Sequence, residues 1–193
     1  MDRIDKAFAK YPRYKFLPQE LRERSNLDMP LSIGFGQTNS QPSTVKTMLR
    51  WLDTEAGQKI LDVGSGSGWT AALLSCLVGP KGRVFAVEKI KQLKEFGENN
   101  CYKVGATNIK FHIAQQQLGW QHHAPYERIL VSAAAEYLPK SLFDQLAVGG
   151  IMIIPIKNDI FEIHKTSGTS QEIFIHSNFV FVPLVHNSQS KNL

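Results

Sequence analysis

Two stretches within the first 58 residues space their apolar side chains at a helical period. Between residues 4 and 11 these side chains fall at i, i+3, i+4 and i+7, which predicts an amphipathic helix that ends at Pro12. The same spacing returns between residues 45 and 52, and Pro42 suits the first turn of this second helix. Residues 29–42 carry glycine, proline and small polar side chains instead, so we expect a loop there.

From residue 59 onward, short apolar runs alternate with helical patterns. This alternation predicts a parallel sheet that is covered by helices on both faces. After residue 158 strand patterns follow one another without helices, which predicts an antiparallel edge. The expected strands are 59–63, 83–88, 109–114, 128–132, 150–156, 160–165, 171–176 and 179–185, and the expected helices are 69–78, 90–103 and 138–147.

The first expected strand leads directly into a glycine-rich turn and then into a helix. Glycine lets the backbone bend sharply and lets a ligand approach it, while the helix N-terminus offers unpaired N–H groups. A dinucleotide fingerprint would need a third glycine where Trp69 stands, and this side chain is too large for that role. The pattern Asp62-x-Gly64-x-Gly66-x-Gly68 instead resembles the first motif of class I S-adenosylmethionine methyltransferases. An ordinary strand–turn–helix connection with chance glycines is the alternative. The expected cofactor-binding residues of this turn are Asp62, Gly64, Ser65, Gly66 and Gly68.

Glu88 ends the next expected strand, about 20 positions beyond the glycine turn. A carboxylate at this place would accept both hydroxyl groups of a ribose. The alternative is a solvated charge at the end of a strand. Dinucleotide and methyl-donor cofactors share this contact, so Glu88 favours an adenosine-containing cofactor without choosing between them.

Composition and charge limit the class of protein. The chain has 193 residues, of which 42% are hydrophobic and 20% charged, so we expect one domain over residues 1–193. We divide it into an N-terminal helical and loop segment (1–58), a cofactor-binding core (59–158) and C-terminal strands (159–185). The net charge is +5, but the Lys and Arg residues are scattered, so we expect no nucleic-acid partner.

Other absences in the sequence predict a cytoplasmic protein without a membrane partner, and we expect a monomer. No apolar run approaches the length of a membrane span, and the N-terminus has no signal-peptide core. Cys76 and Cys101 have neither metal-ligand nor redox spacing, so we expect two small core residues in a reducing compartment. The lone histidines have no partner at metal spacing, and we expect no metal site.

Five segments together carry a more specific pattern: PRYKF at 12–16, IGFGQTNSQP at 33–42, DVGSGSGW at 62–69, residues 131–139 with their triple alanine, and FVPL at 181–184. They resemble the protein-L-isoaspartate (D-aspartate) O-methyltransferase family over about residues 2–185. The resemblance implies an α/β class I methyltransferase fold, with a doubly wound, mostly parallel seven-stranded sheet, an antiparallel edge and a family-specific C-terminal strand order. It also implies S-adenosyl-L-methionine as the cofactor and S-adenosyl-L-homocysteine as its product.

The resemblance further implies the reaction. That family repairs damaged proteins by methylating the free carboxylate of L-isoaspartyl and D-aspartyl residues, so isoaspartyl-containing proteins and peptides are the expected partners. A carboxylate is ionised at pH 7 and is already the nucleophile, so no general base is needed. Ser40 matches the family's active-site serine, and Thr38 lies beside it. Ser40 also precedes a helix start, where the common role of serine is N-capping. Both roles are compatible.

Two positions depart from the family's pattern. Where the family has Gly-Asp-Gly, with the Asp at the adenine amino group, this chain has Ala114-Gln115-Gln116, so Gln115 is the expected adenine contact. Where the family often has Arg before FVPL, this chain has Val180. Two alternatives to isoaspartyl repair therefore stay open. One is a related methyltransferase that acts on another peptide carboxylate or on nucleic acid. The other is a non-catalytic homologue that binds the donor.

Overall fold

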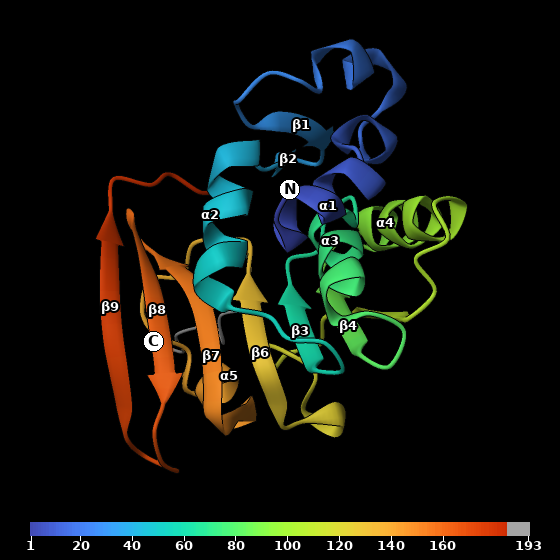
Figure 1. Ribbon diagram of the computed structural model, residues 1–193. Coiled ribbons are helices and arrows are strands. Elements are labelled where there is room, and N and C mark those ends of the chain that lie inside the picture. Colours follow the sequence, from blue (N-terminus) through green and yellow to red (C-terminus); the bar gives the residue numbers. More distant parts are fainter. Residues whose placement is uncertain (185–193) are drawn as a thin grey trace.

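A seven-stranded sheet organises the chain in the computed structural model, which describes residues 1–184 (Figure 1). Its strand order is β5-β4-β3-β6-β7-β8-β9. Pairs from β5 to β7 are parallel, while β8 pairs antiparallel with both of its neighbours. The mostly parallel sheet with antiparallel pairing on one side is therefore confirmed. The strands are β3 (Lys59–Val63), β4 (Arg83–Glu88), β5 (Ile109–Ile113), β6 (Tyr126–Val131), β7 (Leu146–Ile156), β8 (Asp159–Lys165) and β9 (Gln171–Ser177).

The central strands are buried on both faces because their alternate side chains enter two separate cores. Ile60 of β3 belongs to the core beneath α1 (Arg3–Lys10), α2 (Pro42–Leu52) and α3 (Trp69–Val78). Its neighbour Leu61 belongs to the opposite core, which includes Leu142 of α5 (Lys140–Gln145). In Figure 1, α2 and α3 accordingly lie in front of the sheet and α5 behind it. The remaining helical elements are α4 (Lys91–Lys103) and the 3₁₀ turns η1 (Arg13–Phe16), η2 (Gln19–Arg24) and η3 (Gln121–His123).

Residues 29–42 are not only loop, contrary to the sequence-based expectation. They contain a short antiparallel hairpin of β1 (Leu31–Gly34) and β2 (Gln37–Asn39). Leu31 and Ile33 alternate with exposed neighbours and are buried in a small core with Leu93 of α4. The glycines and prolines of this stretch concealed that alternation, because turn-forming residues dominate its composition.

Two further expectations near the C-terminus were wrong. The expected helix 138–147 is shorter, because α5 covers Lys140–Gln145 and the chain is already in β7 at Leu146. The expected strand 179–185 does not form over residues 179–184, and residue 185 lies outside the described residues. Asn178 has a positive φ of 73°, and strand pairing within residues 179–184 is limited to an isolated bridge between Pro183 and Ala134. Proline has no N–H for a full strand ladder.

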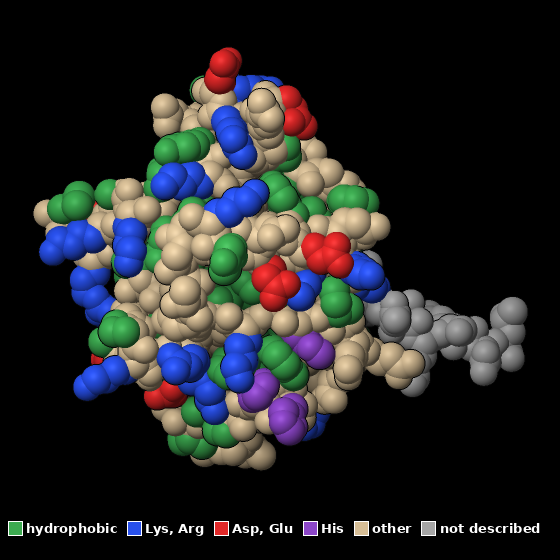
Figure 2. Space-filling view, turned by 90° about the vertical axis from the view of Figure 1, so that its right-hand side faces the viewer, with side chains coloured by type: hydrophobic (Ala, Val, Ile, Leu, Met, Phe, Trp, Pro, Cys, Tyr) green, Lys and Arg blue, Asp and Glu red, His purple; other side chains and the backbone are tan. Residues whose placement is uncertain are grey.

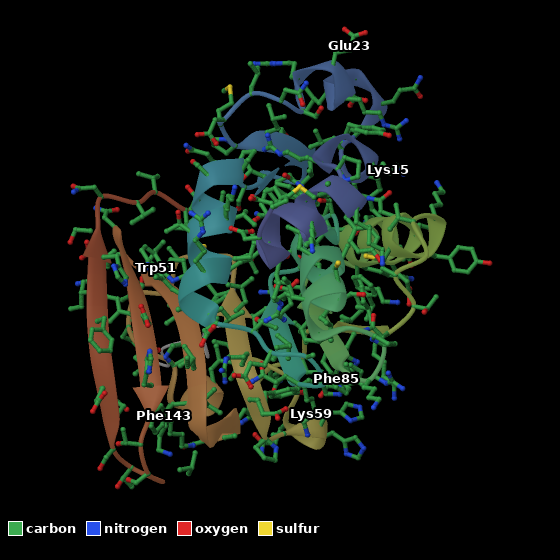
Figure 3. All side chains as sticks on the ribbon, viewed as in Figure 1. Lys15, Glu23, Trp51, Lys59, Phe85 and Phe143 are labelled. Carbon is green, nitrogen blue, oxygen red and sulfur yellow. The ribbon has the colours of Figure 1, made fainter. Side chains whose placement is uncertain are left out.

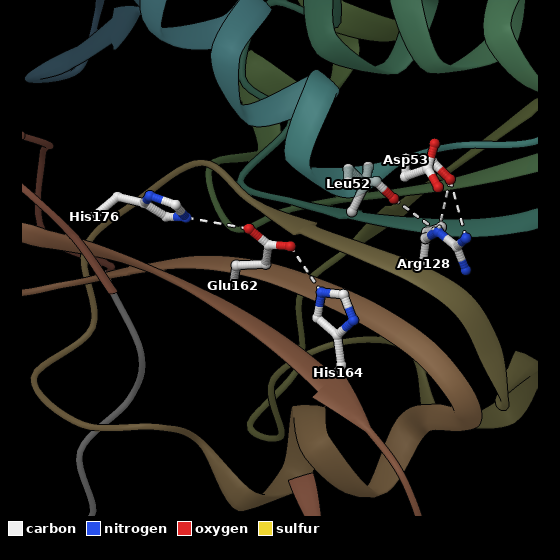
Figure 4. Close-up of polar contacts among 6 residues, drawn as sticks. All are labelled: Leu52, Asp53, Arg128, Glu162, His164 and His176. Atoms are coloured by element: carbon white, nitrogen blue, oxygen red, sulfur yellow. Dashed lines mark hydrogen bonds and ion pairs between the residues drawn. The ribbon is translucent and has the colours of Figure 1, made fainter. Parts of the chain in front are cut away.

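Side chains from the sheet hold the C-terminal half of α2 (Figure 4). The buried guanidinium of Arg128 on β6 donates to the carbonyl groups of Leu52 and Asp53, where the helix ends. These carbonyls have no helical partner, so a cation there is stabilising. Trp51 points from α2 toward the antiparallel strands and stacks on His176 of β9 at 3.6 Å between ring centroids (Figure 3). The carboxylate of Glu162 on β8 accepts hydrogen bonds from the rings of His176 and His164. The bond to His176 holds its ring in the stacked position.

Within residues 1–184, every helix is too short or too polar to cross a bilayer.

Candidate cofactor and substrate site

A cleft lies at the carboxyl ends of the central parallel strands, where ligands bind in open α/β sheets. We call it the central cleft. Two segments contribute to its lining, and we call them its two walls: the glycine turn (residues 64–68), and strand β2 together with Ser40 (residues 37–40), which we call the Ser40 loop. The end of β4, the loops after β5 and β6, and residues 182–184 also contribute to its lining. Of the residues expected from the sequence, its lining includes Thr38, Ser40, Gly64, Ser65, Gly66 and Glu88.

Backbone bonds shape the glycine turn. The N–H groups of Gly64 and Ser65 both donate to the Val87 carbonyl on β4, at 2.8 and 3.2 Å. Gly66 has a φ of +50°, a conformation that residues with a side chain rarely adopt. An added Cβ would lie 3.0 Å from Ile33 Cδ1. The backbone conformation therefore favours glycine at this position, and the Ile33 methyl group of the β1–β2 hairpin packs closely against it.

Gly68 is required for a different reason from the one expected. It caps α3 with a φ of +84° and does not line the central cleft among the described residues. An added Cβ would lie 2.7 Å from the carbonyl oxygen of Gly97, in the middle of α4. Conversely, a Cβ on Gly97 would lie 2.7 Å from the Gly66 carbonyl oxygen. Sequence reasoning missed Gly97, although a glycine inside a helical pattern is a signal of close packing.

Glu88 is buried at the end of β4, with its carboxylate among backbone donors. One oxygen accepts from Gly66 N at 2.9 Å, and the other accepts from Lys89 N and Ile90 N at 2.7 and 2.9 Å. A carboxylate offers about four lone-pair sites, so acceptor capacity remains for a ligand. The solvated-charge alternative does not describe this position, because only 7% of the residue is exposed.

Asp62 lies beneath the glycine turn instead of at the surface of the central cleft. It is completely buried, and one carboxylate oxygen accepts from the Thr70 hydroxyl at 2.8 Å. Burial raises the pKa of Asp62 to about 7, and the nearby charge of Glu88 adds to the effect. Its other oxygen and the Ser65 hydroxyl are both buried without a hydrogen-bond partner in the described part of the chain.

Gln115 is exposed and is not among the lining residues of the central cleft found within residues 1–184. Ala114, Leu118 and Gly119 contribute to that wall instead. The contact between Gln115 and an adenine amino group therefore stays a prediction from the sequence.

Ser40 does not cap α2. The N-cap residue is Gln41, and Asp28 from a distant loop accepts from Ser43 N at 2.9 Å and from the Gln41 side chain at 3.0 Å. The backbone hydrogen bond from Ser43 lowers the pKa of Asp28, as expected for a carboxylate at a helix N-terminus. Because Asp28 performs the capping that the sequence suggested for Ser40, the Ser40 hydroxyl does not serve that purpose.

A second cleft adjoins the first. It extends between the N-terminal half of α2 and residues 178–182, and we call it the adjoining cleft. Thr38, Ser40, Ser132 and Val182 line both clefts, so these residues stand where the two meet. An extended chain in the adjoining cleft could therefore present one side chain to the central cleft. Within residues 1–184, no group of three or more His, Cys, Asp or Glu side chains is arranged to hold a metal ion.

Comparisons with known proteins agree with this geometry. The family model described as Protein-L-isoaspartate(D-aspartate) O-methyltransferase (PCMT) matches residues 1–189. A protein-L-isoaspartate O-methyltransferase of Methanopyrus kandleri is 41% identical over 189 residues, covering 95% of this chain and 84% of the relative.

Two solved structures are also similar. One, a protein-L-isoaspartate O-methyltransferase, has a TM-score of 0.87 at 28% identity and covers 97% of this chain and 62% of its own. The other is described as a protein of the same kind from Plasmodium falciparum in complex with S-adenosyl-L-homocysteine. Its TM-score is 0.83 at 25% identity, covering 97% of this chain and 92% of its own.

Proposed function

The chain belongs to the protein-L-isoaspartate(D-aspartate) O-methyltransferase family, and from this premise we infer that it uses S-adenosylmethionine to methylate the free carboxylate of isoaspartyl residues in damaged proteins. D-aspartyl residues are the second substrate of this repair. One observation carries the assignment of the site: the glycine turn, Glu88, Thr38 and Ser40 all contribute to the lining of the same central cleft. Donor and acceptor would then meet between them.

The residues on the donor side fit S-adenosylmethionine. This cofactor supplies an activated methyl group on a positively charged sulfur. Glu88 has acceptor capacity left for the ribose hydroxyl groups, and the Ser65 hydroxyl is buried without a partner, as expected for a group that awaits a ligand. Gly64 lines the cleft with a φ of +77°, a conformation that glycine adopts freely. Asp62 accepts from Thr70 in the first turn of α3, and Gly68 caps that helix.

The residues on the acceptor side need only bind and orient a carboxylate. This group is ionised at pH 7, so it attacks without a general base. Catalysis then depends on removing water and aligning one carboxylate oxygen with the methyl group. We assign the orienting role to the Ser40 hydroxyl and the supporting role to Thr38, since both stand where the two clefts meet. The adjoining cleft would receive the flanking peptide.

The proposal also covers the setting of the enzyme. We propose one domain over residues 1–193, a monomer in the cytoplasm, and no nucleic-acid partner. The two free cysteines fit a reducing compartment. On the face drawn in Figure 2, basic side chains are spread out with acidic ones among them, unlike the dense basic surface of a nucleic-acid-binding protein.

The test is transfer of a labelled methyl group to an isoaspartyl peptide, with the same peptide containing normal aspartate as the control. We expect label on the first peptide only. Ser40→Ala should lower kcat/KM while the Kd of the donor stays unchanged. Ser25→Ala, which lies outside both clefts, is the matched serine control. Methylation of other carboxylates or of RNA, with no label on isoaspartyl peptide, would identify a related methyltransferase instead. Donor binding with no turnover on any acceptor would identify a non-catalytic homologue.

A further inference from the structure

Arg13 of η1 is a buried cation among neutral acceptors. Only 5% of the residue is exposed, and burial lowers its pKa to about 10, with Asp28 opposing that shift. Its guanidinium makes five hydrogen bonds of 2.7–3.0 Å, none of them to a carboxylate. The acceptors are the backbone carbonyl groups of Leu27, Met29, Asn39 and Ser40 and the side-chain oxygen of Asn39.

Such an arrangement costs free energy unless the bonds are well made, because a buried charge loses its water. The planar guanidinium suits this arrangement, because its N–H groups point in fixed directions and can donate to several acceptors at once. All the acceptors belong to two segments, residues 27–29 and residues 39–40. Arg13 therefore pins the end of the Ser40 loop to the chain that precedes the β1–β2 hairpin.

The same network reaches the glycine turn. Asn39 receives Arg13 Nε on its oxygen at 2.7 Å and donates from its nitrogen to the Ser67 hydroxyl at 3.0 Å. Ser67 in turn is held by Asn100 of α4, which donates to its carbonyl group at 3.0 Å. The Arg13 guanidinium also lies over the ring of Trp69, at 5.6 Å from its centroid.

The chain Arg13–Asn39–Ser67 thus bridges the two walls of the central cleft. Asn39 and Ser67 line the cleft themselves, one from each wall, and Ser40 follows Asn39 directly. A ligand that immobilises the glycine turn would immobilise Ser67, then Asn39, and with it the backbone of Ser40. Coupling through a hydrogen-bonded chain is reciprocal, so a ligand on the Ser40 side would act back on the turn by the same factor.

We propose that Arg13 is a positioning residue which, through Asn39 and Ser67, couples binding of the methyl donor to binding of the isoaspartyl peptide. This inference rests on the proposed function, because it names the two ligands of that site. A purely structural Arg13 would stabilise the fold without linking the two binding events.

Calorimetry measures the coupling directly. The Kd of an isoaspartyl peptide is determined with and without saturating S-adenosylhomocysteine, which holds the donor site without reacting. In the wild type we expect the peptide to bind at least about fivefold more tightly with S-adenosylhomocysteine present. Ser67→Ala removes the acceptor of Asn39 and leaves every Arg13 bond in place, so this ratio should fall to about one. An unchanged ratio in Ser67→Ala, or a wild-type ratio of one, would overturn the inference.

Arg13 variants add a kinetic test. Arg13→Met should lower kcat/KM for the peptide about tenfold or more, with the donor Kd changed less than about threefold. Arg13→Lys keeps the charge but replaces the planar fork with one nitrogen, so it should recover only part of the loss. Arg22→Met is the matched control, since exposed Arg22 makes a single long bond of 3.4 Å to the Leu17 carbonyl. We expect it to behave as the wild type.

The outcomes separate the two proposals. A wild type that methylates isoaspartyl peptide, together with Arg13→Met that melts earlier but keeps both its kcat/KM and the coupling ratio, would sink this inference alone. A wild type that neither binds nor methylates the peptide would reject the proposed function, and the coupling with it. If Arg13→Met does not fold, the ratio in Ser67→Ala decides.

Discussion

The two walls of the central cleft differ in how far they depend on a single distant side chain. The glycine turn is shaped by its own backbone, through hydrogen bonds to the adjacent strand and conformations that glycine adopts freely. The Ser40 loop pairs with β1 along residues 37–39, and its end at Asn39 and Ser40 also depends on the side chain of Arg13, which stands 26 positions before Asn39. The difference teaches where each wall is vulnerable. Added volume and altered backbone conformation would damage the turn, whereas loss of a single polar side chain would release the end of the loop at Ser40.

The largest expected effect breaks the glycine turn from outside. Gly97→Ala adds a Cβ that would meet Gly66 O at 2.7 Å and Gly68 N at 3.0 Å. In an ordinary helix interior this substitution stabilises by about 1 kcal/mol, but here overpacking should reverse the sign and cost about 3 kcal/mol. Urea unfolding measures the loss, and Asn99→Ala, on the exposed side of the same helix, is the control. A variant that is more stable than the wild type would contradict the close packing.

The next effect removes the charge that lies between the turn and the donor. Glu88→Gln keeps the shape of the side chain but places an amide group among three backbone N–H donors. Charge-assisted hydrogen bonds are roughly twice as strong as neutral ones, so the affinity for the methyl donor should fall about tenfold. Titration with S-adenosylhomocysteine measures it, with the exposed Glu95→Gln as the matched carboxylate control. Equal affinity in both variants would remove Glu88 from the donor site.

The third effect concerns the buried acid beneath the turn. The pKa of Asp62 is about 7 in the folded protein against 3.8 as the ordinary value, so the folded state retains a proton that the unfolded chain has released. The free energy of unfolding should therefore fall as pH rises through this window, by about 1 kcal/mol per pH unit. Asp62→Asn should abolish that slope, whereas exposed Asp144→Asn should keep it. Unfolding curves at several pH values between 4 and 8 provide the measurement. Parallel pH dependence in wild type and Asp62→Asn would show that another group titrates.

The smallest effect sharpens the outline of the cleft. From the family pattern, Gln115→Asp should tighten donor binding about fivefold, because a carboxylate accepts from the adenine amino group with charge assistance. The exposed position of Gln115, outside the lining, instead leads us to expect a change of less than about twofold. Titration of wild type and variant with S-adenosylhomocysteine separates the two values. Clear tightening would return Gln115 to the adenine contact.

Much of the donor wall could be read from the chain, because it depends on short-range patterns. An apolar strand, three glycines and an apolar helix follow one another within residues 59–78, and Glu88 ends the very next strand. The periodicity of apolar residues also located every strand from β3 to β9, with shifts of a few residues at the ends. The β1–β2 hairpin escaped, because the buried pair Leu31 and Ile33 is a very short alternation among turn-forming residues.

Only the tertiary structure decided how the acceptor wall is held. Three contacts join residues that are far apart in the chain. Asp28 caps α2 and leaves the Ser40 hydroxyl free of that role, Gly97 packs against Gly68, and Arg13 donates to Asn39. No periodicity encodes such pairs, since each depends on where whole elements come to lie. The sequence by itself determined strand β3, the glycine turn and the acidic residue at the end of β4, because these features depend on residues that are close together in the chain. The packing of distant segments determined which polar groups meet at the cleft. A buried charge or amide needs hydrogen-bond partners, and the tertiary structure decides which residues lie close enough to provide them.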